Sequence, residues 1–467
     1  MQIASPLFLF LFLPLTLPLL PLCKKKHRKA VMALISVAFF LLANYKNPWG
    51  LLPVGAILLL ACLLVCIPCE IFSRLRLWLG VSLSLSVFFA ARVACEAFPQ
   101  HHTYPLGLGL VTLGAISLCI DHYRADVTEC ETPLGVIGYL LFFPTLTLGP
   151  VLRYKQYLYI AEHASSSLSD FSAGALLYIK GFLKRIAVCT MLFALLQNVL
   201  SVLQNETVLP LPVLIFALVF AFLALYFTVS GITDMSRGLM TLYGYRPSRG
   251  QARFFDRVAP HRMLSALLCS LDAFLEDYVG TPLRRLFPHK SGKALAALVI
   301  CAATLLFYRT HPALLLIALP LLLCAVLLAQ APRYLRRPRA RALRIPLMLL
   351  SSLCLSLVAL AMMLESPLTL FALLAGAFQK TDLLTLYHVS MSFAYINHLI
   401  AALLFLLLYA PLSRFNPRLV AKLPARVQTA AHYAGALATL AAFCLALWLL
   451  LPQFPQYDTL VYGGIFS

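Results

Sequence analysis

Charged residues are scarce in this chain of 467 residues. Asp, Glu, Lys and Arg together make up 12% of it, whereas 61% of the residues are hydrophobic. A soluble domain carries about 25% charged residues. No soluble fold of this length has enough polar side chains to cover so much apolar surface. The composition therefore excludes an ordinary soluble protein and indicates an integral membrane protein.

Acidic residues are especially few. There are 17 of them against 37 Lys and Arg, which gives a formal net charge of +20. The basic residues collect in short runs between apolar segments, at 24–29, 333–344 and 414–426. Lys and Arg in short loops mark the cytoplasmic side and meet anionic lipid there. No polar stretch is long enough for a soluble nucleic-acid-binding domain, so we expect membrane lipid, and no nucleic acid, as a partner.

The cysteines lack the pattern of a metal site or a disulfide framework. There are thirteen, mostly scattered through apolar segments. Cys62 and Cys66 stand at helical spacing, but no His or acidic residue accompanies them as a further ligand. The sequence therefore predicts neither a structural disulfide nor a metal site.

Apolar runs of the length needed to cross a membrane recur along the whole chain. They lack the alternation of strands, and backbone inside lipid must satisfy its own hydrogen bonds, so we expect helices. We predict an all-α, polytopic transmembrane helical bundle of roughly 11–13 spans or half-spans. No Ser/Gly-rich linker divides it, which predicts a single integral membrane domain, 1–467. The candidate spans are 3–22, 30–44, 51–69, 77–95, 105–120, 133–148, 182–203, 208–229, 294–308, 313–330, 345–364, 385–410 and 429–451.

The basic runs also predict the orientation of these spans. Positive charges follow the first apolar run, 3–22, rather than precede it. This order is typical of a retained first span and not of a cleaved signal peptide. With residues 23–29 in the cytoplasm, the next two spans return Arg74 and Arg76 to the same side.

Four stretches carry unusual polar, glycine or proline residues for a membrane segment, where such polar residues are costly. Small residues in the first let helices approach closely, and prolines in the second break a helix where backbone lines a cavity. In the third, Asp234 and Arg237 stand three residues apart, and we expect them to form an ion pair. The stretches are motif 1 (105–124, PLGLGLVTLGAISLCIDHYR), motif 2 (143–154, FPTLTLGPVLRY), motif 3 (226–239, YFTVSGITDMSRGL) and motif 4 (274–283, FLEDYVGTPL).

In this order the four motifs resemble those of the membrane-bound O-acyltransferase (MBOAT) family. The resemblance is closest to the branch of alginate O-acetyltransferases and D-alanyl lipoteichoic acid transferases, and it covers about residues 105–466. It implies an MBOAT-like core, with Arg153, Asp234, Arg237, Asp277 and Tyr278 as supporting site residues. Glu276 stands where the family has an arginine.

The resemblance also implies a catalytic base, His311, in the segment TLLFYRTHPALLL. A neutral imidazole can take the proton of a hydroxyl as that hydroxyl attacks a thioester. Basic segments on both sides of 294–330 predict a hairpin that places His311 in the outer half of the membrane. An earlier histidine of the family is replaced here by Leu268, and His261 is the nearby candidate to substitute for it.

These features predict a membrane-bound O-acyltransferase that moves a short, acetyl-like group from a thioester donor to a hydroxyl of an exported polysaccharide or cell-envelope glycan. The resemblance implies acyl-CoA or an acyl-carrier thioester as donor, and no permanently bound cofactor. It implies a glycan acceptor or a periplasmic or extracellular acyltransferase as partner, in the plasma membrane of a bacterium. Two alternatives stay open: a degenerate family member acting as a scaffold, which Leu268 favours, and an unrelated polytopic transporter. A transporter is expected to show two similar halves, which this sequence lacks.

Overall fold

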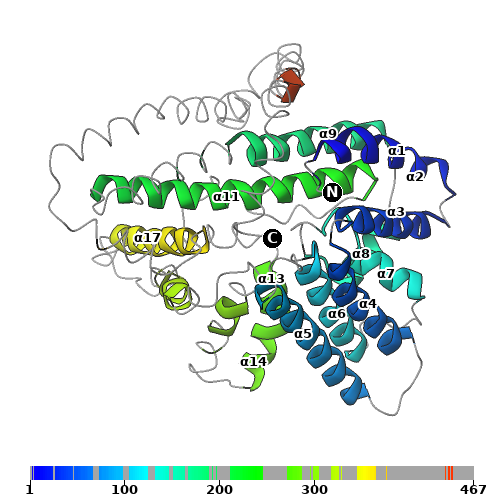
Figure 1. Cartoon of the computed structure of the whole chain (residues 1–467), viewed down its shortest axis with the longest axis horizontal. Coiled ribbons are helices and arrows are strands. Elements are labelled where there is room, and N and C mark those ends of the chain that lie inside the picture. The colour runs from blue at the N-terminus through cyan, green and yellow to red at the C-terminus, as the bar shows by residue number, and fades with distance from the viewer. Residues whose placement is uncertain are drawn as a thin grey trace.

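The fold is helical throughout the part of the chain that the structure describes. A computed structural model describes residues 5–24, 27–45, 47–66, 73–97, 105–124, 132–146, 151–162, 167–188, 211–245, 271–286 and 344–363, with Ile3 and short pieces at 192, 196, 295–328, 375 and 437–444. Within these ranges every regular element is a helix (Figure 1). This confirms the predicted all-α, polytopic class.

Three of the described helices are long and apolar enough to cross a membrane: Pro48–Cys66, Arg74–Cys95 and Ala217–Leu242. The third belongs to α11 (Leu211–Leu242), in which 72% of the most apolar stretch is buried inside the protein. The other two lie in α4 (Leu51–Cys66) and α5 (Ser73–Ala97), where only 28% and 22% are buried. Apolar side chains that remain exposed to this extent need lipid around them. The chain is therefore a membrane protein with α11 as its central helix.

Most spans predicted in the first 120 residues coincide with helices, and so does the predicted span 345–364. The span 3–22 is helical but irregular, with a turn at Leu17 and Pro18. The remaining elements are η1 (Phe8–Phe12), α1 (Leu13–Thr16), α2 (Leu19–Leu22), α3 (Arg28–Ala43), η3 (Pro48–Gly50), α6 (Leu108–Tyr123), α7 (Pro133–Leu140), α8 (Tyr154–Glu162), α9 (Leu168–Phe182), η4 (Leu183–Val188), α13 (Leu271–Leu275), η6 (Glu276–Gly280), α14 (Thr281–Leu286) and α17 (Arg344–Met363).

Three predicted spans in the middle of the chain have wrong boundaries. The helix expected over 133–148 ends at Leu140. The helix expected from residue 182 begins at Leu168, where the Ser167 hydroxyl caps it by accepting from the Asp170 N–H at 3.1 Å. The helix expected to end at 229 continues to Leu242. Gly244 terminates the helix just beyond Leu242, because its φ of 80° is left-handed. The Tyr245 N–H then donates back to the Met240 carbonyl at 2.8 Å. Motif 3 therefore lies inside α11 and not at its end.

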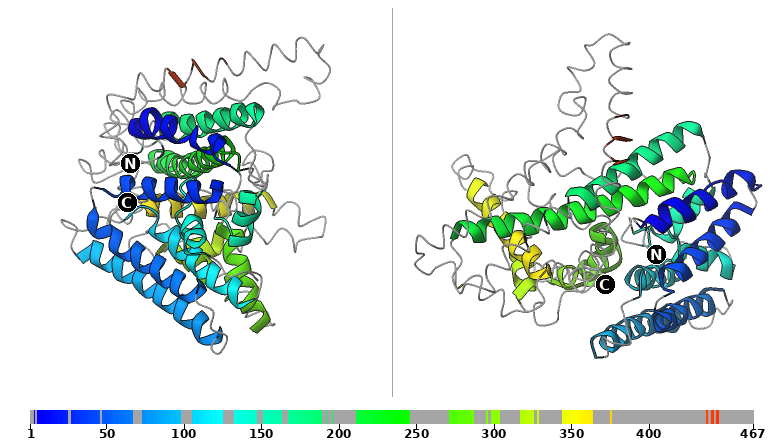
Figure 2. Two further views of the ribbon diagram at one scale, coloured as in Figure 1. Left: turned by 90° about the vertical axis from the view of Figure 1, so that its right-hand side faces the viewer. Right: turned by 45° about the horizontal axis from the view of Figure 1, so that its top comes forward.

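Helices α9 and α11 lie side by side and cross closely (Figures 1 and 2). Each carries two glycines seven residues apart at the crossing, Gly174 and Gly181 on α9 and Gly231 and Gly238 on α11. A Cβ on Gly181 would lie 2.5 Å from the Gly231 carbonyl oxygen, and one on Gly238 would lie 2.5 Å from the backbone nitrogen of Tyr178. Small residues of this kind let helix backbones touch inside a membrane.

Helices α4, α5 and α6 form a second group (Figures 1 and 2). A Cβ on Gly80, near the start of α5, would lie 2.6 Å from the Cys119 sulfur, near the end of α6. The start of α5 therefore lies beside the end of α6, which brings Arg74 and Arg124 to the same end of the group. The positive-inside pattern predicts that this end faces the cytoplasm.

Candidate functional site

In the connection between α7 and α8 the structure describes residues 141–146 and 151–153, which are not helical and include part of motif 2. The Phe143 N–H donates to the Ser36 hydroxyl at 3.2 Å, and the Ser236 hydroxyl donates to the Pro144 carbonyl. The Tyr139 hydroxyl donates to the Leu152 carbonyl at 2.9 Å. Side chains from three different helices thus satisfy backbone groups that the break leaves open. Inside a membrane, irregular backbone is tolerated only where protein or a cavity surrounds it.

Two aromatic residues anchor this connection to the rest of the protein. The Phe143 ring packs against Phe8, Phe39 and Tyr243, with ring centroids 6.3, 5.4 and 5.3 Å apart. The neighbouring ring of Phe142 lies 5.4 Å from that of Tyr245. Since Tyr243 and Tyr245 follow motif 3, the rings of Phe142 and Phe143 attach the connection after α7 to the end of α11.

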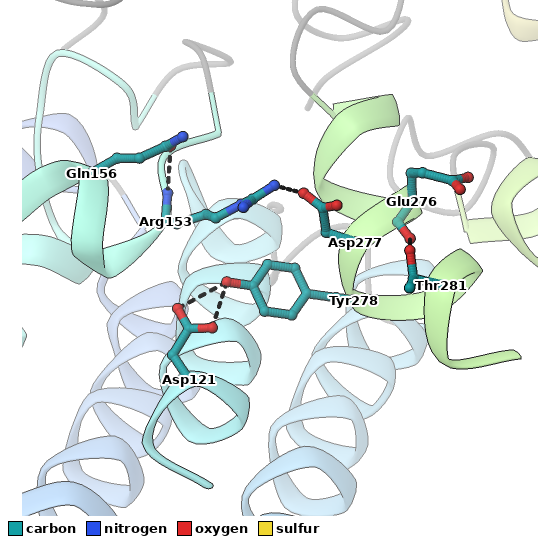
Figure 3. Close-up of polar contacts among 7 residues, drawn as sticks. All are labelled: Asp121, Arg153, Gln156, Glu276, Asp277, Tyr278 and Thr281. Carbon is teal, nitrogen blue, oxygen red and sulfur yellow. Dashed lines mark hydrogen bonds and ion pairs between the residues drawn. The ribbon is translucent and has the colours of Figure 1, made fainter. Parts of the chain in front are cut away.

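A polar cluster joins motif 1 to motif 4. The Tyr278 hydroxyl lies 2.8 Å from both carboxylate oxygens of Asp121, to which it donates (Figure 3). Asp121 is only 5% exposed, at the end of α6, and Tyr278 is on η6. A buried carboxylate is costly unless hydrogen bonds satisfy it. The contact therefore fixes η6 against α6.

Motif 2 joins the same cluster through Arg153. Its guanidinium forms an ion pair with Asp277, next to Tyr278, and lies 5.9 Å from the centre of the Tyr278 ring (Figure 3). The guanidinium of Arg124 lies 5.5 Å from the same ring centre. Three of the five predicted supporting residues, Arg153, Asp277 and Tyr278, are therefore neighbours, together with Asp121 of motif 1.

Glu276, which stands in place of the family's arginine, points away from this cluster (Figure 3). Its carboxylate forms an ion pair with Arg284, with one nitrogen–oxygen distance of 2.9 Å. Its carbonyl accepts from the Thr281 hydroxyl at 3.0 Å. The negative charge of Glu276 is thus neutralised within the segment η6–α14. Glu276 therefore does not compete with Asp277 for Arg153.

The prediction that Asp234 forms an ion pair with Arg237 is wrong. Asp234 pairs with Lys184, whose ammonium also donates to the Ser230 hydroxyl at 3.2 Å. The Lys184 and Asp234 side chains are 20% and 19% exposed. The cause is the close crossing of α9 and α11, which brings η4 against Ser230 and Asp234 on the face of α11. Within the described residues no carboxylate pairs with Arg237.

Removing one partner of this pair is expected to cost about 3–5 kcal/mol, because the other charge then stays uncompensated near lipid. We expect Asp234→Ala and Lys184→Ala each to lower the amount of folded protein, and the Asp234→Ala/Lys184→Ala double variant to recover part of it. The measurement is the monodisperse fraction after extraction in mild detergent. Arg237→Ala is the matched control, and it should not rescue Asp234→Ala. Rescue by Arg237→Ala instead of Lys184→Ala would contradict the pairing.

A small cavity lies between motifs 1 and 2. Its volume is about 30 Å³, which exceeds the ~10–15 Å³ that one water molecule needs. The Tyr139 hydroxyl at its edge lies 2.9 Å from that of Ser117, one helical turn before Asp121. The lining residues are Leu110, Gly114, Tyr139, Leu140, Phe142, Thr145, Leu146, Val151 and Leu152.

The other sequence predictions about the site are untested. His311, His261 and Leu268 lie outside the described residues, so the catalytic assignment stays a prediction. The sequence analysis missed the partner of Asp234, Lys184. The glycines spaced seven residues apart on both helices could have indicated this partner, because matched spacing predicts that the two helices cross closely.

Comparison with known proteins supports the resemblance. No family model matches the chain. The chain is 28% identical over 276 residues to the probable alginate O-acetylase AlgI of Pseudomonas aeruginosa, covering 53% of this chain and 50% of that protein. It is 29% identical over 258 residues to the AlgI of Pseudomonas fluorescens (53% and 50% covered) and 26% identical over 273 residues to that of Azotobacter vinelandii (53% and 52% covered).

The chain thus spans about half the length of the curated relatives that it matches. These similarities confirm the predicted resemblance to alginate O-acetyltransferases of the membrane-bound O-acyltransferase kind.

Proposed function

We propose that this chain is a membrane-bound O-acetyltransferase that moves an acetyl group from a thioester donor to a hydroxyl of an exported polysaccharide. The observation that carries the proposal is the convergence of three motifs in one cluster. Asp121 of motif 1, Arg153 of motif 2 and Tyr278 of motif 4 meet although more than 150 positions separate the first from the last. The similarity to proteins named as probable alginate O-acetylases supports the same activity.

The reaction joins the hydroxyl oxygen to the acyl carbon and breaks the carbon–sulfur bond of the thioester. The hydroxyl proton passes to a base, and the thiolate that leaves is protonated to a thiol. His311 is the proposed base, since a neutral imidazole is suited to accept a proton near neutral pH. The donor is acyl-CoA or an acyl-carrier thioester, used as a substrate and not held as a permanent cofactor.

Location and partners follow from the same proposal. The enzyme works in the plasma membrane of a bacterial cell, where a cytoplasmic thioester and an exterior hydroxyl can both reach it. The acceptor is the glycan itself or a periplasmic or extracellular acyltransferase that passes the acetyl group on. A transporter is less well supported, because the relatives are named as acetylases. The scaffold alternative rests on Leu268 in place of one family histidine.

Expression in cells that export alginate but lack their own acetylase tests the proposal. The chain should restore O-acetyl esters on the exported polymer, measured by release of acetate in mild alkali. The matched control is the same membrane protein with Gly55→Ala, at a position where a Cβ meets nothing within 4 Å. Polymer without acetyl esters, despite normal amounts of both proteins in the membrane, would argue for the scaffold alternative.

A further inference from the structure

Arg124 ends α6 in an unusual environment. Its side chain is exposed, and its guanidinium lies over the Tyr278 ring. Within the part of the chain that the structure describes, no carboxylate pairs with it. The Asp121 carboxylate one turn earlier is instead held by the Tyr278 hydroxyl. Among the described residues, the N–H groups of Arg124 are therefore not taken up by a carboxylate.

The ring of Tyr278 fixes the position of two guanidinium groups. Its hydroxyl is anchored on buried Asp121, and its ring centre lies 5.5 Å from Arg124 and 5.9 Å from Arg153. A guanidinium that stacks on an aromatic ring retains its charge and its planar fork of donors. Arg153 uses one of its nitrogens for Asp277. Stacking on the Tyr278 ring restricts the two arginine side chains, so they lose less conformational freedom when an oxyanion binds.

The carboxylates described around the cluster are each engaged by a partner other than Arg124, since the Tyr278 hydroxyl donates to Asp121. Asp277 neutralises Arg153, and Glu276 neutralises Arg284. Arg124 thus adds positive charge at the end of α6, which lies beside the start of α5 with Arg74 and, by the positive-inside pattern, faces the cytoplasm.

We infer that Arg124, stacked on Tyr278 beside Arg153, binds the phosphate of the thioester donor. This inference rests on the proposed acyl transfer. Planar guanidinium groups bind phosphate through two parallel hydrogen bonds. Coenzyme A and acyl-carrier proteins share one such group, the phosphate on their pantetheine arm, and both reach the membrane from the cytoplasm. The site therefore recognises the part of the donor that the two have in common.

Two small acetyl donors isolate the contribution of the phosphate to binding. Acetyl-4′-phosphopantetheine and acetyl-pantetheine carry the same thioester and differ only in the phosphate. We expect purified wild-type protein in phosphatidylcholine vesicles to show a KM about tenfold or more lower for the phosphorylated donor, since a hydrogen bond to a charged group is worth about 1.5–3 kcal/mol. Arg124→Gln should remove this difference by raising the KM for the phosphorylated donor to the KM for acetyl-pantetheine. Arg74→Gln, an exposed arginine at the same end of the protein, is the matched control and should keep it.

Equilibrium binding of 4′-phosphopantetheine tests the site without any transfer. Binding by the wild type and by Arg74→Gln, but not by Arg124→Gln, would support it even if no acetyl group is transferred, in which case the proposed function alone fails. Equal use of the two donors by an active wild type would overturn the inference. So would an effect of Arg124→Gln seen only as lost stimulation by phosphatidylglycerol, because the arginine would then hold a lipid headgroup. Failure of the wild type to bind 4′-phosphopantetheine would overturn it as well.

Discussion

Replacement of His311 by alanine is expected to abolish O-acetylation of the exported polysaccharide. General-base catalysis contributes about 10²–10⁴-fold to a rate, and a hydroxyl is a poor nucleophile near neutral pH without it. Leu268, at the other family histidine position, cannot accept a proton, so no second family histidine is left to compensate. The measurement is the acetyl content of the polymer in cells that carry only the variant.

Loss of acetylation is informative only if the variant protein is still made and folded. His101→Ala is the matched control, because His101 lies between the predicted spans 77–95 and 105–120 and has no assigned role. Both variants should be extracted from the membrane in the same amount and with the same monodispersity as the wild type. Normal acetylation by His311→Ala would show that another residue, of which His261 is the first candidate, acts as the base.

Replacement of Gly181 by alanine is expected to destabilise the protein strongly. The new Cβ would lie 2.5 Å from the Gly231 carbonyl oxygen and closer still to the Met235 nitrogen, both of which belong to the backbone of α11. Neither can move aside as a side chain can, so α9 and α11 must separate. Overpacking of this kind costs about 1–3 kcal/mol or more. It also breaks the contact that brings Lys184 to Asp234.

The matched control is Gly55→Ala on α4, where a Cβ meets nothing within 4 Å. Alanine in a helix is preferred over glycine by about 0.5–1 kcal/mol, so this variant should be as stable as the wild type or slightly more so. The midpoint of thermal aggregation in detergent measures both variants. Equal midpoints for Gly181→Ala and the wild type would contradict the close crossing of α9 and α11.

Hydrophobic run lengths predicted the long apolar helices α3, α4, α5, α6 and α17, because each helix in lipid must be apolar over most of its length. They did not predict α8, most of α9 or the helices at 271–286. They did not predict where helices end. Motif 3 looked like the end of a span because it carries Asp234 and Arg237. It lies inside α11 since α9 covers that polar face and Lys184 neutralises the aspartate. A polar residue therefore ends a span only where no neighbouring helix pairs with it.

Three members of the polar cluster could be predicted, but Asp121 as a fourth member and the geometry of the cluster could not. Resemblance to the family pointed to Arg153, Asp277 and Tyr278, whereas the contact between Tyr278 and Asp121 depends on how η6 packs against α6. Contacts between segments so far apart in sequence arise from the tertiary fold, and spacing within one segment carries no information about them. Likewise, the expectation that Asp234 pairs with Arg237 relied on local spacing, and a residue 50 positions away in sequence takes that place.

The most direct test of the proposed activity uses the purified wild-type protein in vesicles with radiolabelled acetyl donors. Acetyl-CoA and an acetylated acyl-carrier protein are each supplied on the cytoplasmic side, with an alginate oligosaccharide on the other. The proposal predicts that label from at least one donor becomes an alkali-labile ester on the oligosaccharide or on an added periplasmic partner, at a rate that rises with the amount of protein. Folded, monodisperse protein that releases no thiol and transfers no label from either donor would contradict it.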